Sequence, residues 1–165
     1  MTRASESVSP WLAARSVAWM LLPFVVAGYV PWTFFGLSAA RVDVRDPVHV
    51  LGLVLMAAGA TLLLACIREF AVSGRGPLGP PDPPKELVVR GLYRYVRNPM
   101  YLSVATLLIG ETLLVQAVPL LVYFVIWFSF VNIFVLAYEE PALRGKFGAS
   151  YEQYTQSVGR WLPHR

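Results

Sequence analysis

The stretch from Met100 to Tyr138 reads MYLSVATLLIGETLLVQAVPLLVYFVIWFSFVNIFVLAY, and its only charged residue is Glu111. A helix needs roughly 20 mostly apolar residues to cross the hydrocarbon core of a bilayer. This run is long enough to cross twice, and Pro119 near its middle marks a break between two helices. The stretch therefore predicts two membrane-spanning helices, 100–118 and 120–138, that form a tight antiparallel hairpin.

Two further apolar stretches, 16–37 and 48–67, precede this hairpin. The first resembles a signal peptide in ending near Ser38-Ala39-Ala40, but its apolar run exceeds the ~7–15 residues of a signal core, which favours a retained helix. Hydrophobic residues make up 56% of the chain and charged residues 15%, against about 25% charged in soluble domains. We therefore expect a single all-α, multi-pass membrane domain, 1–165, with about four transmembrane helices.

The net charge of +4 and the pI of about 9.5 raise the question of nucleic-acid binding. The basic residues flank the apolar segments, as determinants of membrane topology do, so we predict a lipid bilayer as partner and no nucleic acid. Cys66 is the only cysteine, and His49 and His164 are the only histidines. This composition argues against a disulfide, a zinc or di-iron site, or a Cys-His catalytic pair.

The basic residues also predict the orientation in the membrane. Six lie in the 68–99 connection and four follow residue 138, whereas none lies in the hairpin turn. Because basic residues concentrate on the cytoplasmic side, both termini are predicted to be cytoplasmic, in a bacterial inner membrane or its equivalent. Within the 68–99 connection, the proline-rich segment 74–84 is typical of a semi-rigid spacer. The sequence does not indicate an oligomeric state.

Two polar residues fall inside the predicted hairpin. Glu111 is a functional candidate by default, because an ionisable group inside a bilayer is costly. The hairpin geometry also allows a structural role, in which Glu111 faces Tyr123 and Trp127. Asn132 is expected to pair across the hairpin with residues 103–106, as interhelical polar pairs commonly do.

The first chemically rich motif, Gly91 to Ser103, reads GLYRYVRNPMYLS. Pro99 suits the first turn of a helix, and Asn98 suits its N-cap. Arg97 would then lie beside free backbone N–H groups at the positive helix end, where an anionic group is favoured. Taken alone, the motif is more typical of an arginine and tyrosine anchor at the membrane surface.

The second motif begins with Glu139 and Glu140, at the predicted end of the last span. Carboxylates at a helix C-terminus oppose the helix dipole, and such an unfavourable placement tends to mark a functional site, here for a cation or an amine. The tail that follows predicts a short amphipathic cytoplasmic helix, from the spacing of Phe147, Tyr151, Tyr154 and Val158.

The hairpin places Arg97 at the start of one helix and Glu139-Glu140 at the end of its partner, on the same face of the membrane. The result is a pocket with an anion-binding end and a cation-binding end, ringed by aromatic residues that also attract cations. S-adenosylmethionine carries a carboxylate, an ammonium, a sulfonium and an adenine, and it suits such a pocket.

Together the two motifs resemble those of the isoprenylcysteine carboxyl methyltransferase and phospholipid methyltransferase family. The resemblance covers roughly residues 86–163 and rests on Gly91, Tyr93, Arg97, Asn98, Pro99, Tyr101, Glu139, Glu140, Leu143, Phe147, Gly148, Tyr151, Tyr154, Val158, Arg160 and Pro163. Two residues depart from the family pattern, since Asn98 replaces the usual histidine and Ser103 replaces a frequent glycine.

The resemblance implies a multi-pass helical fold, S-adenosylmethionine as cofactor, and methyl transfer to a lipophilic acceptor that enters from the bilayer. The acceptor could be a carboxylate, a thiol or an amine. We expect Arg97 and Glu140 to be catalytic. The expected cofactor-binding residues are Gly91, Tyr93, Asn98, Pro99, Tyr101, Glu139, Glu140 and Tyr151.

Three alternatives remain open from the sequence. A membrane reductase that uses NADPH would share the general architecture. A small transporter would use Glu111 as a proton-coupled site. A non-enzymatic assembly factor with a decayed site is disfavoured by the intact Arg97 and the Glu139-Glu140 pair.

Overall fold

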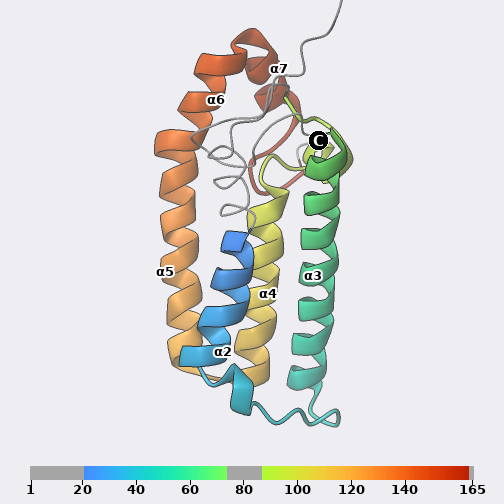
Figure 1. Ribbon diagram of the computed structural model, residues 1–165, viewed down its shortest axis with the longest axis vertical. Coiled ribbons are helices and arrows are strands. Elements are labelled where there is room, and N and C mark those ends of the chain that lie inside the picture. Colours follow the sequence, from blue (N-terminus) through green and yellow to red (C-terminus); the bar gives the residue numbers. More distant parts are fainter. Residues whose placement is uncertain (1–20, 74–86, 164–165) are drawn as a thin grey trace, which may run out of the picture.

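The computed structural model describes residues 21–73 and 87–163 of the chain. The start of the first predicted span, 16–20, and the proline-rich segment 74–84 lie outside these residues. In chain order the elements are η1 (Val25–Tyr29), α2 (Val30–Phe34), η2 (Leu37–Ala39), α3 (Pro47–Ser73), η3 (Gly91–Arg94), α4 (Pro99–Val115), α5 (Val118–Phe134), η4 (Val135–Glu139), α6 (Glu140–Phe147) and α7 (Ala149–Ser157). The long helices lie side by side as a bundle, with α6, α7 and the C-terminal segment gathered at one end (Figure 1).

Helices α3 and α4 pack backbone against backbone through glycines. A Cβ added to Gly110 would lie 2.7 Å from the carbonyl oxygen of Gly52, and one added to Gly59 would lie 2.9 Å from the amide nitrogen of Leu107. Close approach of this kind requires small residues at the helix interface. The glycines therefore allow α3 to pack closely against α4 of the hairpin.

The apolar helix Leu21–Phe34 covers the hairpin from another side and contains the π-helical turn η1. The amide of Val30 donates to the carbonyl of Val25, five residues back. In this register the next donor would be Pro31, which has no N–H. The carbonyl of Val26 instead accepts a hydrogen bond from the hydroxyl of Tyr123 on α5, at 3.1 Å. A side chain of α5 thus satisfies the acceptor that the proline leaves open.

The hairpin itself turns earlier than predicted. Helix α4 ends at Val115, its C-cap residue Gln116 adopts the left-handed conformation with φ of 54°, and Ala117 is extended. Pro119 does not separate the two helices but lies in the first turn of α5, where its missing N–H leaves no helical bond unmade.

Helix α5 does not end at Glu139 and Glu140, so the prediction of two carboxylates at a helix C-terminus is wrong. The helix runs without interruption from Val118 to Phe147, through the π-helical turn η4 and into α6. It stops at Gly148, whose φ of 51° and ψ of −126° lie outside helical geometry. The tail then forms α7, whose buried Tyr151 and Tyr154 cluster with Val158.

Two helices are long and apolar enough to cross a membrane, Pro47–Glu69 and Val118–Phe147, and two shorter apolar helices accompany them, Leu21–Phe34 and Pro99–Val115. Large apolar side chains on α5, such as Ile126 and Phe130, are about two-thirds exposed, as lipid-facing residues of a bundle are. The chain is therefore a helical membrane protein, and the count of four spans stays a prediction.

Glu111 lies in the interior of this bundle. Its side chain is 1% exposed, near Tyr123 as expected. The hydroxyl of Tyr123 donates its hydrogen bond to the carbonyl of Val26 and not to Glu111. Oε2 of Glu111 is buried and has no hydrogen-bond partner among the described residues.

Candidate active site

The candidate site is built where the C-terminal segment lies along the residues that precede α4. Val96 and Gly159 form a parallel β-bridge, and the amide of Arg97 donates to the carbonyl of Gly159 at 2.9 Å. The side-chain amide of Asn98 donates to the carbonyl of Arg160 at 3.4 Å. Two segments about 60 residues apart in the sequence are therefore held together by their backbones.

Asn98 does not act as predicted at the start of α4. Pro99 begins the helix as expected, but the Asn98 side chain makes no capping hydrogen bond. It is 8% exposed and holds the C-terminal segment instead. A neutral amide at this position can donate to a carbonyl at any pH, which suits a structural tie.

The centre of the site is the carboxylate of Glu140, which is 3% exposed. The guanidinium of Arg160 contacts both of its oxygens, with Nε 2.6 Å from Oε1 and Nη2 3.0 Å from Oε2. Nη1 of Arg97 lies 3.0 Å from the same Oε1. The hydrogen bonding of Arg160 to Glu140 raises the pKa of Arg160 above its ordinary value. Two guanidinium groups and one carboxylate leave one positive charge in excess.

Tyrosines surround this ion cluster. The hydroxyl of Tyr151 lies 3.5 Å from Nη1 of Arg97, and the hydroxyl of Tyr154 donates to the backbone carbonyl of Tyr93. Burial, followed by the charge of Glu140, raises the pKa of Tyr151, and burial raises the pKa values of Tyr93 and Tyr154. These phenols therefore remain neutral near pH 7 and serve as hydrogen-bonding groups rather than as bases.

Glu139, next to Glu140 in the chain, has a different partner. Its Oε2 accepts a hydrogen bond of 3.1 Å from the hydroxyl of Tyr101, and no guanidinium pairs with it among the described residues. The ring of Tyr101 also packs edge-on against Trp161, with centroids 6.5 Å apart. The two adjacent carboxylates, at the end of η4 and at the start of α6, therefore have different partners, a phenol for Glu139 and two guanidinium groups for Glu140.

The prediction that Asn132 pairs with residues 103–106 is wrong. Its Oδ1 accepts a hydrogen bond of 3.1 Å from Nε1 of Trp161. The hydroxyls of Ser103 and Thr106 instead donate to carbonyls of their own helix, four residues back. The polar residue of α5 therefore anchors the C-terminal segment rather than the hairpin.

The structure thus brings together most of the residues expected at the site: Arg97, Asn98, Pro99, Tyr101, Glu139, Glu140, Tyr93 and Tyr151. Gly91 lies at the start of η3, with φ of 55°. Two participants were not predicted as site residues, Arg160 and Trp161. Arg160 had a signal in the sequence, because it is the arginine of the closing Val-x-Arg-x-x-Pro pattern.

Comparison with known proteins confirms the family resemblance of the sequence. The model of the phospholipid methyltransferase family matches residues 47–150, which include α3, the hairpin and Glu140. An uncharacterized protein of Haemophilus influenzae is 38% identical over 63 residues, which are 38% of this chain and 100% of that protein. No solved structure matches the chain. Members of the matched family are S-adenosylmethionine-dependent methyltransferases. This chain belongs to the phospholipid methyltransferase family.

Proposed function

We propose that the protein transfers a methyl group from S-adenosylmethionine to a lipophilic acceptor at the cytoplasmic face of a membrane. The observation that carries this proposal is the double ion pair of Glu140 with Arg97 and Arg160. It joins the start of α4, the α5–α6 helix and the C-terminal segment, which are the parts of the chain that carry the family motifs. The acceptor group remains a carboxylate, a thiol or an amine.

The charges of the site fit a zwitterionic cofactor. The excess positive charge lies at Arg97 and Arg160, and Nε of Arg97 is buried without a hydrogen-bond partner among the described residues. This end suits the cofactor carboxylate. Glu139, which no guanidinium neutralises in the described part of the chain, suits its ammonium group. Tyr93, Asn98, Tyr101 and Tyr151 would line the space between the two ends, with Gly91 and Pro99 shaping its backbone.

When bound, S-adenosylmethionine supplies an electrophilic methyl group. The contribution of the protein is then to align the acceptor and exclude water, which is worth up to ~7–11 kcal/mol for well-oriented reactants. Arg97 would hold an anionic group in a fixed direction, because Glu140 and Tyr151 restrain its guanidinium. A carboxylate or thiolate acceptor needs no strong base, which agrees with neutral tyrosines around the site.

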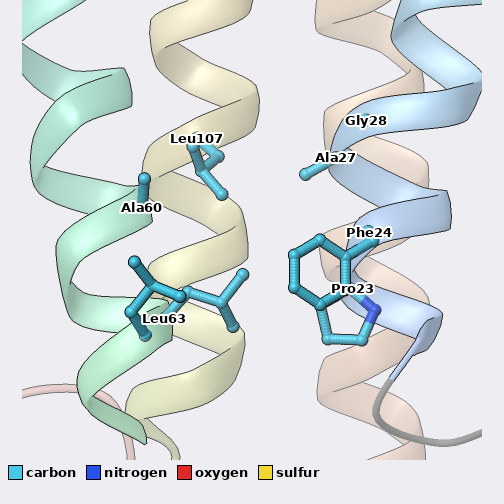
Figure 2. Close-up of a pocket in the computed structure, with 8 residues that line it drawn as sticks. Pro23, Phe24, Ala27, Gly28, Ala60, Leu63 and Leu107 are labelled. Carbon is cyan, nitrogen blue, oxygen red and sulfur yellow. The ribbon is translucent and has the colours of Figure 1, made fainter. Parts of the chain in front are cut away.

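An apolar groove supports a lipophilic acceptor (Figure 2). It has a volume of about 230 Å³ and lies between the helix Leu21–Phe34, α3 and α4. Its lining is entirely hydrophobic or glycine: Pro23, Phe24, Ala27, Gly28, Ala60, Leu63, Leu64 and Leu107. The next turn of α3 after Leu63 carries Cys66, which contacts Tyr93 and Ser103. Leu63 of the groove therefore lies about one helical turn from a residue that contacts Tyr93 of the candidate site.

Binding of the cofactor tests the proposal directly. Titration calorimetry of the purified protein in detergent should show binding of S-adenosylmethionine and none of NADPH. Transfer of a labelled methyl group to a total lipid extract should follow, and the labelled product would reveal the acceptor class. Binding of NADPH without S-adenosylmethionine would instead support the reductase.

A second candidate function is proton-coupled transport through Glu111, favoured by its burial and its unpartnered carboxyl oxygen. Transport predicts proton-linked uptake of a cation into vesicles that is lost in Glu111→Gln. Methyl transfer predicts that Glu111→Gln keeps its activity as long as the bundle stays folded. Family membership favours methyl transfer.

A further inference from the structure

Trp161 of the C-terminal segment contacts both helices of the hairpin. Its indole N–H donates to Oδ1 of Asn132 on α5, at 3.1 Å. Its ring packs against Phe128, also on α5, with centroids 5.3 Å apart, and edge-on against Tyr101 on α4, with centroids 6.5 Å apart. The indole is therefore held in place between the two helices, although the next residue, Leu162, is 78% exposed.

The hydrogen bond of Trp161 is a second link between the two segments that Arg160 and Glu140 join. Asn132 and Glu140 both belong to the continuous helix Val118–Phe147. Arg160 and Trp161 are neighbours in the C-terminal segment. A guanidinium by itself would hold this segment through a long side chain, and restraining such a side chain costs conformational entropy. The rigid indole fixes the adjacent backbone, and with it the direction from which the guanidinium reaches Glu140.

The backbone bonds of the same segment face a different element. The carbonyl of Gly159 accepts from the amide of Arg97, and the carbonyl of Arg160 accepts from the side chain of Asn98. Both donors precede α4, so these bonds fix the segment relative to α4. The alignment with the helix that carries Glu140 comes from the side chains of Arg160 and Trp161.

Trp161 also acts on the second carboxylate of the site. Tyr101, whose hydroxyl donates to Oε2 of Glu139 at 3.1 Å, meets the indole at an interplanar angle of 63°. Edge-to-face contacts of this kind are directional, so the indole limits the positions that the phenol can take. One residue thus restrains the partner of Glu139 and, through the adjacent Arg160, a partner of Glu140.

We propose that Trp161 is a positioning residue for the amino-acid part of S-adenosylmethionine, an inference that rests on the proposed function. The cofactor carboxylate is proposed to bind at Arg97 and Arg160, and its ammonium at Glu139. Trp161 acts through these residues by holding Arg160 and Tyr101 in place. Release of the indole therefore misplaces both ends of the zwitterion and leaves the binding of the adenosine part unchanged.

The experiment measures binding of two ligands to the full chain in detergent, S-adenosylmethionine and 5′-methylthioadenosine, which lacks the amino-acid part. Trp161→Phe keeps an aromatic ring beside Tyr101 and removes the N–H. Because one neutral hydrogen bond is lost, binding of S-adenosylmethionine should weaken about twofold to tenfold, with unchanged affinity for 5′-methylthioadenosine. Trp161→Leu also loses the ring contacts and should weaken S-adenosylmethionine further.

The partner and a matched control complete the set of variants. Asn132→Leu removes the acceptor and should weaken S-adenosylmethionine as Trp161→Phe does. The double variant should be little worse than either single one, because both substitutions remove the same bond. Trp127→Phe is the control, because Trp127 lies on the same helix and packs against Phe128 and the core around Leu108. It should leave both affinities unchanged.

The outcomes separate positioning from general support of the fold. Equal weakening of both ligands by Trp161→Phe overturns the inference, as do additive effects of Trp161→Phe and Asn132→Leu. Unchanged affinity for S-adenosylmethionine in folded Trp161→Phe and Asn132→Leu also overturns it, and these two variants decide if Trp161→Leu does not fold. Absence of S-adenosylmethionine binding by the wild-type protein overturns the inference together with the proposed function.

Discussion

At the scale of single residues, Glu140 differs from every other carboxylate in the described part of the chain in having two guanidinium partners. Replacing it by glutamine keeps the shape but leaves Arg97 and Arg160 without a counter-charge. Breaking a buried ion pair of this kind costs about 3–5 kcal/mol. We expect Glu140→Gln to lose cofactor binding and methyl transfer, and to unfold at a clearly lower temperature in detergent.

The control for this variant is Glu152→Gln. The side chains of Arg144 and Glu152 are 50% and 56% exposed, and their closest N–O distance is 3.6 Å. Exposed pairs contribute about 0–1 kcal/mol, so neither activity nor thermal stability should change measurably. Full activity in Glu140→Gln would show that the double ion pair is not needed for function.

Alanine at Gly91 would cost stability in two ways, through its left-handed backbone conformation and through contact of its Cβ with Glu69, and the two costs can be measured separately. Alanine at Gly36, with φ of 79° and nothing within 4 Å of its added Cβ, should cost only the ~1–2 kcal/mol of a left-handed residue. Gly91→Ala should cost more, because its Cβ also meets Glu69. Thermal unfolding of Gly91→Ala with and without Glu69→Ala tests this, since removing the Glu69 side chain should recover the steric part. Additive effects of the two substitutions would contradict the contact.

At the scale of elements, the continuation of the helix past Glu139 and Glu140 decides what these two carboxylates can contact. A regular helix that ended at these residues would leave both carboxylates at its C-terminus. The continuous helix Val118–Phe147 instead places Glu139 beside Tyr101 and Glu140 beside Arg97 and Arg160. π-helical turns are frequent at functional sites, and η4 ends at Glu139, which has no arginine partner within residues 21–73 and 87–163, next to Glu140, which has two.

The apolar groove gives a prediction about the helix Leu21–Phe34. Gly28 lines the groove, and a Cβ at this position meets nothing within 4 Å. We expect the side chain of Gly28→Leu to fill the groove and displace about two methylenes of a bound chain, at about 0.8 kcal/mol each. The KM for a long-chain acceptor should rise about tenfold, with unchanged affinity for S-adenosylmethionine.

The matched control for the groove is Ala58→Leu. Ala58 is an exposed residue of α3 that does not line the groove, so the added side chain should face lipid. The kinetics of this variant should match those of the wild-type protein for long-chain and short-chain acceptors alike. Equal effects of Gly28→Leu on both acceptor lengths would argue against the groove as a binding site for the chain.

At the scale of the whole molecule, the predicted orientation places the hairpin turn outside and the α6–α7 end in the cytoplasm. Cys66, the only cysteine, is 1% exposed and should not react in the folded protein. Single cysteines at Val118, which is 71% exposed at the turn, and at Gly145, an exposed residue of α6, can therefore report the topology.

The labelling experiment uses right-side-out membrane vesicles and a maleimide that does not cross the bilayer. Val118→Cys should react in intact vesicles, whereas Gly145→Cys should react only after the vesicles are opened. The unmodified chain provides the background from Cys66. The reverse pattern would invert the orientation and place the candidate site on the outer face.

Much of the architecture follows from the sequence alone, because it depends on local composition. The apolar run of Met100–Tyr138 is long enough for two helices whatever surrounds it, and Pro99 starts α4 because its fixed φ and missing N–H suit a first turn. The sequence predicts Arg97 as a site residue from its place before a helix start and Glu140 from an expected helix end, and the structure shows that the two side chains pair.

Only the tertiary structure decided which residues are partners. Asn132 binds Trp161 and not the facing helix, Arg160 joins Glu140 across 20 residues, and Glu69 reaches Gly91 across the α3–η3 contact. None of these pairs shares a local periodicity that a sequence pattern could reveal. They depend on the register of a π-helical turn and on how closely two helices approach, and both are set by packing over the whole bundle.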